Sequence, residues 1–245
     1  MLRVGLTGGL SSGKSTVAAM LRALGAEVVE ADELGRALMQ PGQPVFSAIV
    51  DHFGAEVVSP DGRLNRARLA ELAFKDGRVQ ELNALIHPAV IDAEQQWMDE
   101  LFARNPAAVA VIESALIFEV ERDARARGES GTALADWRRR MDRVIVVTAP
   151  DEQKIARYAA RLSPGGLGLA AGVPSDRSSS LGWAAAEADA RLRLAHQIPD
   201  AIKAASADYV INNAGDRGDL RAQVERLWPR LAAESNYSPA KESLE

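Results

Sequence analysis

The sequence predicts an α/β fold in which a five-stranded parallel sheet is covered by helices on both faces. Short apolar runs recur along the chain with helical stretches between them, at 2–7, 27–30, 108–113, 143–148 and 209–211. Short runs that are apolar throughout are typical of strands buried on both faces. Helices between successive strands favour parallel pairing, because parallel strands need a long crossover connection.

The composition is that of an ordinary globular protein. The 245 residues are 47% hydrophobic and 26% charged, and the net charge of −5 gives no basic field for a nucleic acid. We therefore expect no nucleic-acid partner. The chain has no cysteine, which excludes disulfides, thiol catalysis and cysteine-bound zinc. It shows neither a signal peptide nor an apolar run of 18 residues, so we expect a cytoplasmic protein without a membrane span.

Two helices are expected on either side of the second strand. In the first, one apolar stripe at helical spacing is formed by Val17, Met20, Leu21 and Leu24. Gly25 is the expected C-terminal stop of this helix. The second helix is expected to begin at Asp32 and to end before Pro41.

A helical block at about 60–105 separates the second and third strands, and a plain crossover would need only about a dozen residues. Asn65 is expected to cap a helix that runs through Phe74. A second helix is expected around residues 79–86, and Pro88 is expected to open a third. We interpret this block as an insertion that binds the acceptor substrate.

Three segments show no pattern that predicts packing in the core. Residues 119–140 are charge-dense and predict a solvated helix or loop, and residues 163–182 are rich in Gly, Ser and Pro and predict a mobile loop. Residues 231–245 are expected to be a disordered tail. We therefore expect one domain over residues 1–230. Its core would comprise about 1–58, 106–155 and 200–230, with a lid at about 156–197.

The phosphate-binding motif G-x-x-x-x-G-K-[ST] follows the first strand. It consists of Gly8, Gly9, Leu10, Ser11, Ser12, Gly13, Lys14 and Ser15, and Thr16 follows it. The glycines permit backbone angles that side chains forbid, so that successive N–H groups can wrap an anion. Lys14 would reach the β- and γ-phosphates, and the Ser15 hydroxyl would coordinate Mg²⁺. Residues 8–16 are therefore predicted to bind ATP–Mg²⁺; the alternative is a Gly-rich turn with an exposed lysine.

Two acidic residues stand at the carboxyl ends of predicted strands, the edge where ligands bind in open α/β sheets. Asp32 follows the second strand and could accept a hydroxyl proton or hold Mg²⁺ through water. It could equally be the N-cap of the helix that follows. Glu113 ends the third strand and is the best candidate in the sequence to support the metal.

Arg157 and Arg161 lie four residues apart, so they share a helix face just before the Gly/Ser-rich stretch. Such a face suits a lid whose arginines meet phosphate charge on closing. A solvated basic face is the alternative, and it is the stronger interpretation for Arg191 with its neighbour Gln197. His87 is a lone histidine and is better explained as structural than as a catalytic base.

The residues together resemble the dephospho-coenzyme A kinase family. The matching elements are 6–16, Glu30-Ala31-Asp32, Arg36, 62–66, 82–88, 116–119, Gln153 with Arg157 and Arg161, Arg191 with Gln197, and 207–213. The resemblance extends to about Trp228, and the combination from Glu30 to Pro88 is its most specific part.

This resemblance implies a P-loop kinase-like three-layer fold with a helical substrate-binding insertion and a lid. It also implies transfer of the ATP γ-phosphoryl group, with Mg²⁺, to the ribose 3′-hydroxyl of dephospho-coenzyme A. Asp32 matches the catalytic aspartate of the family and, with Lys14, is a catalytic candidate. Arg157 and Arg161 match its lid arginines, and Asn213 would lie near adenine. Further candidates for substrate binding are Arg36, His87 and Arg191. We expect a monomer or a weak homo-oligomer.

The sequence departs from the family pattern at several positions. Glu30 replaces the first Asp of Asp-Ala-Asp, and Ser11 stands where glycine is common. Leu162 stands where an aspartate usually follows the lid arginine. Residues 120–140 and 163–182 look like insertions, which weakens the residue-by-residue correspondence in the lid most.

Three other functions compete with this interpretation. Another small-molecule P-loop kinase would differ in residues 60–105, which set the acceptor pocket. A GTPase or a regulatory ATPase is disfavoured, because the Asn-Lys-x-Asp element of guanine recognition does not occur in the sequence. The retention of Asp32 at the strand edge argues against a binding module that has lost its chemistry.

Overall fold

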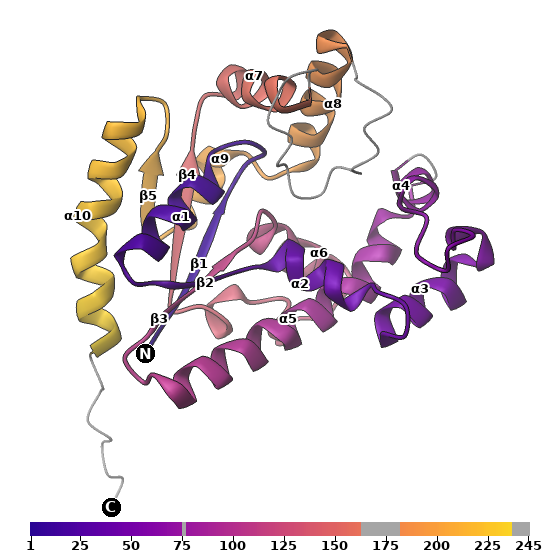
Figure 1. Ribbon diagram of the computed structural model, residues 1–245, viewed down its shortest axis with the longest axis horizontal. Helices are drawn as coiled ribbons and strands as arrows, with labels where there is room; N and C mark the ends of the chain where they lie inside the picture. Colours follow the sequence, from indigo (N-terminus) through magenta and orange to yellow (C-terminus); the bar gives the residue numbers. More distant parts are fainter. Residues whose placement is uncertain (75–76, 163–181, 237–245) are drawn as a thin grey trace, which may run out of the picture.

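A computed structural model describes residues 1–74, 77–162 and 182–236, and a parallel sheet forms its centre (Figure 1). Its strands are β1 Leu2–Gly8, β2 Glu27–Glu30, β3 Val109–Glu113, β4 Arg143–Thr148 and β5 Tyr209–Asn212. The strand order is β2-β3-β1-β4-β5, and every neighbouring pair is parallel. The predicted five-stranded parallel sheet is therefore confirmed.

Helices cover both faces of the sheet, as predicted. In the described part of the chain they are α1 Lys14–Leu24, α2 Ala31–Leu38, α3 Pro44–Phe53, α4 Arg66–Phe74, α5 Val79–Arg104, α6 Ile117–Ala126, α7 Asp151–Leu162, α8 Trp183–His196, α9 Asp200–Ser206 and α10 Arg217–Asn236, with the short 3₁₀ turns η1 Ala55–Val57 and η2 Trp137–Arg139. α1 and α10 cover one face, and α2, α5 and α6 cover the other (Figure 1). None of these described helices is both long enough and apolar enough to cross a membrane.

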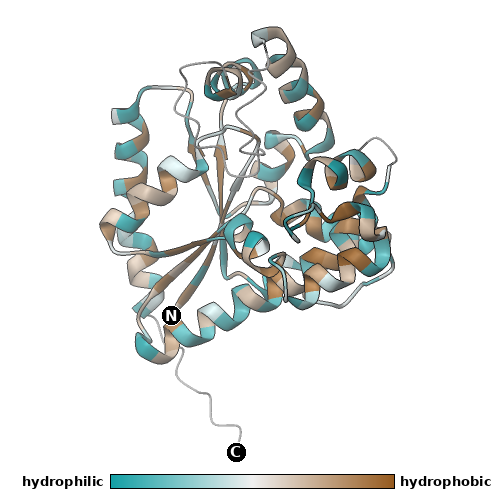
Figure 2. Ribbon diagram, turned by 45° about the vertical axis from the view of Figure 1, so that its right-hand side comes forward, coloured by the Kyte–Doolittle hydropathy of each residue, from teal (hydrophilic) through white to brown (hydrophobic). Residues whose placement is uncertain are grey.

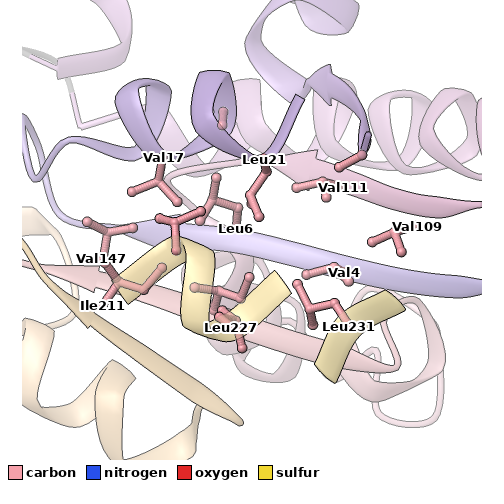
Figure 3. Packing of buried hydrophobic residues seen from close by; sticks show 14 of the residues in the cluster. Val4, Leu6, Val17, Leu21, Val109, Val111, Val147, Ile211, Leu227 and Leu231 are labelled. Carbon is pink, nitrogen blue, oxygen red and sulfur yellow. The ribbon is translucent and has the colours of Figure 1, made fainter. Parts of the chain in front are cut away.

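The face under α1 and α10 shows how the sequence pattern becomes a core. Val17 and Leu21 come from α1 and Leu231 comes from α10, and they converge on side chains of the strands (Figure 3). All three are fully buried, and burying such a side chain contributes about 1.5–3 kcal/mol. The strands are hydrophobic along most of their length, whereas the helices mix polar and apolar residues (Figure 2). α1 ends at Gly25, whose φ of 109° is left-handed, as predicted for a stop.

The charge-dense segment 119–140 is more buried than predicted. α6 packs on the second face of the sheet, and the ring of its Phe118 meets the buried ring of Trp137 edge-on at 5.9 Å between centroids. Glu119 is buried as well, and Lys203 neutralises it at 2.7 Å. The prediction of a solvated helix or loop is therefore wrong for the buried part of the segment, where charge is paired inside the protein, whereas residues 130–133 are exposed as predicted.

Between β2 and β3, helices α3, α4 and α5 build the predicted helical insertion. Asn65 caps α4 as predicted, since its Oδ1 accepts a hydrogen bond from the backbone N–H of Arg68 at 3.0 Å. In contrast, α5 runs unbroken through Pro88, so the prediction that Pro88 opens a helix is wrong. An interior proline costs about 3 kcal/mol, and the packing of a buried stripe on α5 offsets this cost. The stripe consists of Val90, Glu94, Met98 and Leu101.

The predicted lid corresponds to α7 and α8, which lie at the end of the sheet opposite the N-terminus (Figure 1). The two helices pack together through the buried side chains of Ile155, Tyr158 and Ala190. The predicted mobile loop at 163–182 falls almost entirely on residues 163–181, which lie outside the described residues.

The predicted disordered tail, 231–245, is helical in its first part. α10 extends to Asn236, and Leu231 is fully buried in the core under α1 and α10. The prediction is therefore wrong for residues 231–236, because the buried Leu231 anchors this end of the helix in the core. Residues 237–245 lie outside the described residues.

Replacing Leu231 by alanine should lower the free energy of unfolding by about 2–4 kcal/mol, because the change leaves a cavity in a packed core. Urea unfolding followed by circular dichroism would measure it. Arg230→Ala is the control, since Arg230 is exposed on the same helix and should change stability by about 0.5 kcal/mol or less. Equal unfolding midpoints for the two variants would contradict the role of α10 in the core.

Candidate active site

The loop between β1 and α1, residues 8–16, is the P-loop predicted from the sequence. Its shape leaves no room for side chains at the two motif glycines. A Cβ at Gly8 would lie 2.2 Å from the carbonyl oxygen of Val147 on β4. A Cβ at Gly13 would lie 2.1 Å from Nδ2 of Asn213, and Gly13 has a left-handed φ of 102°. The motif requires glycine at these positions for steric as well as conformational reasons.

Ser11, the residue that replaces a common glycine, also has a left-handed backbone, with a φ of 55°. This conformation is unfavourable for a residue with a Cβ. The Ser11 hydroxyl accepts a hydrogen bond from Nη2 of Arg161 on α7. The Ser11 side chain thus joins the P-loop to Arg161, one of the predicted lid arginines.

Asn213 fixes the other side of the P-loop. Its Nδ2 donates to the carbonyl oxygen of Ser12 at 2.7 Å, and its backbone N–H donates to Thr148 at 2.8 Å. Its own carbonyl oxygen accepts a hydrogen bond from Nη2 of Arg157 at 2.9 Å. Asn213 therefore connects the P-loop, the end of β4 and the second lid arginine.

Lys14 begins α1, and its ammonium group is turned back toward the loop. Its Nζ donates to the carbonyl oxygens of Gly8 at 3.1 Å and Gly9 at 3.2 Å. Burial lowers the pKa of Lys14 to about 8, although the charge of Glu113 acts in the opposite direction. An anion bound beside Lys14 would favour its charged form.

Glu113 ends β3, where it stands in register with Leu6 of β1 and Glu30 of β2. Burial raises the pKa of Glu113 to about 7; the Lys14 charge lowers it, and Glu30 and Asp32 raise it further. Its Oε2 is buried and has no hydrogen-bond partner among the described residues. An unpartnered carboxylate oxygen of this kind suits a hydrated cation.

Asp32 lies in the first turn of α2, directly after β2. The helix begins one residue earlier than predicted, and Glu30 occupies the N-cap position. The N-cap alternative for Asp32 is therefore wrong. Asp32 is exposed, and its charge acts on both Lys14 and Glu113. A carboxylate in this position is accessible to a second substrate.

A cavity of about 550 Å³ brings most of the predicted ATP-binding residues together. Its lining includes Ser11, Gly13, Lys14, Ser15, Thr16, Glu113, Arg157, Arg161 and Asn213. Gly8, Gly9 and Ser12 complete the loop behind it and are buried. The structure thus places the motif, one strand-end acid and both lid arginines around one space.

Three predicted substrate-binding residues lie elsewhere. Arg36 is half-buried in the last turn of α2. His87 is inside α5, where burial lowers its pKa to about 4. The charge of Asp123 on α6 acts in the opposite direction and raises this pKa. Arg191 is exposed on α8 and forms an ion pair with Glu152 at 3.1 Å. The structure does not bring Arg191 or His87 into the cavity of the P-loop.

Several residues at the site have no role in the sequence-based prediction. Arg217 lines the cavity, and Gln197 and Asp200 accept hydrogen bonds from the P-loop backbone. Gln197 stood out as part of a polar face and of the family resemblance, but no contact with the P-loop was predicted for it. Asp200 carries no signal in spacing or composition, because it begins the short helix α9, whose position beside the P-loop depends on the whole fold.

The fold and the P-loop define the chain as a P-loop kinase-like protein. The sequence profile of the family described as Dephospho-CoA kinase matches residues 2–130. Dephospho-CoA kinase of Moorella thermoacetica is 36% identical over 94% of this chain and 92% of its own length. The protein of the same name from Anaeromyxobacter dehalogenans is 39% identical over 93% of this chain and 91% of its own. The chain belongs to the dephospho-CoA kinase family, which confirms the predicted resemblance.

Solved structures agree with this assignment. A crystal structure from Thermus thermophilus has 28% identity and a TM-score of 0.63, and it covers 94% of this chain and 96% of its own. Dephospho-CoA kinase from Campylobacter jejuni has a TM-score of 0.58 at 20% identity over 94% and 97%, which shows the shared fold. The activity of the family is ATP-dependent phosphorylation of dephospho-CoA, in coenzyme A biosynthesis.

Replacing Gly13 by alanine should weaken ATP binding by about tenfold or more, since the new methyl group would displace Asn213 from the P-loop. Isothermal titration with ATP would measure it. Gly42→Ala is a matched control, because Gly42 has a φ of +87° and a Cβ there would meet no atom within 4 Å. If both variants bound ATP equally well, the steric argument for Gly13 would be wrong.

Proposed function

We propose that this chain transfers the γ-phosphoryl group of ATP to the ribose 3′-hydroxyl of dephospho-CoA, and that Asp32 is the base. The observation that carries the proposal is the placement of the P-loop and Asp32 at the same edge of one parallel sheet. The two are close enough for the Asp32 charge to act on Lys14. Ligands of open α/β sheets bind at this edge.

Backbone N–H groups of the P-loop and the N-terminus of α1 would hold the phosphates of ATP. Lys14 would exchange its present contacts with the Gly8 and Gly9 carbonyls for phosphate oxygens. Arg157 and Arg161 line the same cavity from α7, so they can stabilise negative charge on the transferring group. Asn213 and the residues after it would lie near the nucleotide base.

The residues present fit a magnesium ion. The described residues contain no cluster of three or more His, Cys, Asp or Glu side chains able to hold a metal. Mg²⁺ in kinases needs no such cluster, since it is bound by one or two protein oxygens together with phosphates and water. The Ser15 hydroxyl and the unpartnered Oε2 of Glu113 would supply them. The bound ion would neutralise charge on the phosphates.

Asp32 would orient the acceptor hydroxyl and take its proton. As the ribose 3′-oxygen forms a bond to the γ-phosphorus, the bond from that phosphorus to the β–γ bridging oxygen breaks, and ADP leaves. Arg36 lies four residues after Asp32, so it shares the same helix face and can hold an anionic acceptor. The roles of His87 and Arg191 in substrate binding stay predictions, as do a cytoplasmic location and a monomeric or weakly oligomeric state.

A coupled ADP-release assay with several acceptors tests the reaction. We expect ADP release with dephospho-CoA and little or none with AMP, CMP, adenosine or pantetheine phosphate. We expect EDTA to abolish turnover and Mg²⁺ to restore it. Turnover with a nucleoside monophosphate alone would contradict the proposed acceptor, whereas the P-loop and its ATP site would stand.

Asp32→Asn should reduce kcat by about 10²-fold or more and leave ATP affinity nearly unchanged, because it removes the base without touching the P-loop. Steady-state kinetics and ATP titration would separate the two effects. Glu33→Gln is the matched control, since Glu33 is an exposed carboxylate in the same helical turn. Near-normal turnover of Asp32→Asn would exclude Asp32 as the base.

A further inference from the structure

The linker between α8 and α9, residues 197–199, and the first residue of α9 hold the first half of the P-loop. Leu10 N–H donates to Oε1 of Gln197 at 2.9 Å. Gly9 N–H donates to Oδ1 of Asp200 at 3.1 Å. The Leu10 side chain also packs against the core formed by α7 and α8. Two successive backbone donors of the P-loop thus have acceptors from one short segment that is distant in sequence.

The linker is itself fixed by a buried ion pair. Ile198 N–H donates to Oε1 of Glu119 at 2.9 Å, and the same oxygen pairs with Nζ of Lys203 at 2.7 Å. Lys203 also donates to the carbonyl oxygen of Ala115 at 3.2 Å. The Lys203 and Glu119 side chains are 0% and 4% exposed. Breaking such a pair would leave an uncompensated buried charge, so it holds the linker in one position.

Asp200 is held from a second direction. Its Oδ2 pairs with Nζ of Lys154 at 2.8 Å, and Lys154 is almost fully buried. Gly9 fits closely against both, because a Cβ there would lie 2.8 Å from Oδ1 of Asp200 and 3.0 Å from Nζ of Lys154. Asp200 therefore has one oxygen directed to the P-loop and the other to a lysine of α7.

We propose that Gln197 and Asp200 are positioning residues for ATP: they set the conformation of the P-loop before the nucleotide binds. The side-chain oxygens of Asp200 and Gln197 fix the N–H groups of Gly9 and Leu10, which restrains the loop where it leaves β1. A restrained loop loses less conformational freedom when phosphate binds, so affinity is higher than with a free loop. The inference rests on the proposed ATP-binding role of the P-loop, and neither residue is expected to touch the acceptor.

Gln197→Ala and Asp200→Ala test the proposal directly. Each removes one acceptor from a P-loop N–H, and we expect ADP to bind about tenfold more weakly in isothermal titration. Amide hydrogen exchange of the peptide containing residues 8–13 should become faster by a similar factor. KM for dephospho-CoA should change by about twofold or less, because the acceptor site is not involved.

Asp151→Ala is the matched control for Asp200→Ala. Asp151 pairs with the same Nζ of Lys154 at 2.7 Å but is exposed and makes no contact with the P-loop in the described structure. It should bind ADP like the wild type. Asp200→Asn keeps an acceptor oxygen for Gly9 N–H, so it should recover most of the affinity. If Asp200→Ala does not fold, Gln197→Ala provides the test, because it removes the acceptor of Leu10 N–H.

Unchanged ADP binding in folded Gln197→Ala and Asp200→Ala, together with unchanged exchange of the P-loop peptide, would overturn the proposal. An equal loss of ADP binding in Asp151→Ala would overturn it as well, because the effect would then be a general one on α7. Failure of the proposed function would give a different result from failure of this proposal. In that case the wild type would bind ADP, and the variants would bind it less well, but dephospho-CoA would not be phosphorylated.

Discussion

The structure of the active site depends on one steric constraint: two backbone positions of the P-loop are closed against neighbouring strands. Gly8 lies against the carbonyl oxygen of Val147 on β4, and Gly13 lies against Asn213, which follows β5. Both contacts exist only because β1, β4 and β5 are adjacent and parallel in a fixed register. The sheet therefore supports the loop and also determines its shape. Any slip in the register of the strands would move Val147 and Asn213, the residues against which the loop packs.

The same constraint brings opposite charges together at the carboxyl edge of the sheet. Burial makes the ammonium form of Lys14 less stable, and it makes the carboxylate of Glu113 less stable. A nucleotide phosphate favours the charged lysine, and a hydrated cation favours the charged carboxylate. The two perturbed groups are thus complementary to a phosphate and a cation, and the family uses ATP as its phosphate donor. Asp32 remains exposed beside them and can serve the second substrate.

Local signals allowed much of this structure to be predicted. The strands, the end of α1 at Gly25, the Asn65 cap and the P-loop all depend on residues within a few positions of one another. The features that were predicted wrongly depend on distant partners. Packing of α5 offsets the cost of Pro88, Lys203 neutralises Glu119, and the core under α1 and α10 buries Leu231. Asp200 was missed for the same reason, because its partner Gly9 is 191 positions away.

The hydrogen bond from Asn213 to Ser12 joins residues that are 201 positions apart. The ribosome therefore synthesises the P-loop long before the residue that forms one of its walls. During translation the loop remains incomplete until β5 has been added to the sheet. A complete nucleotide site therefore requires β5 and Asn213, and a nascent chain that stops before β5 lacks it.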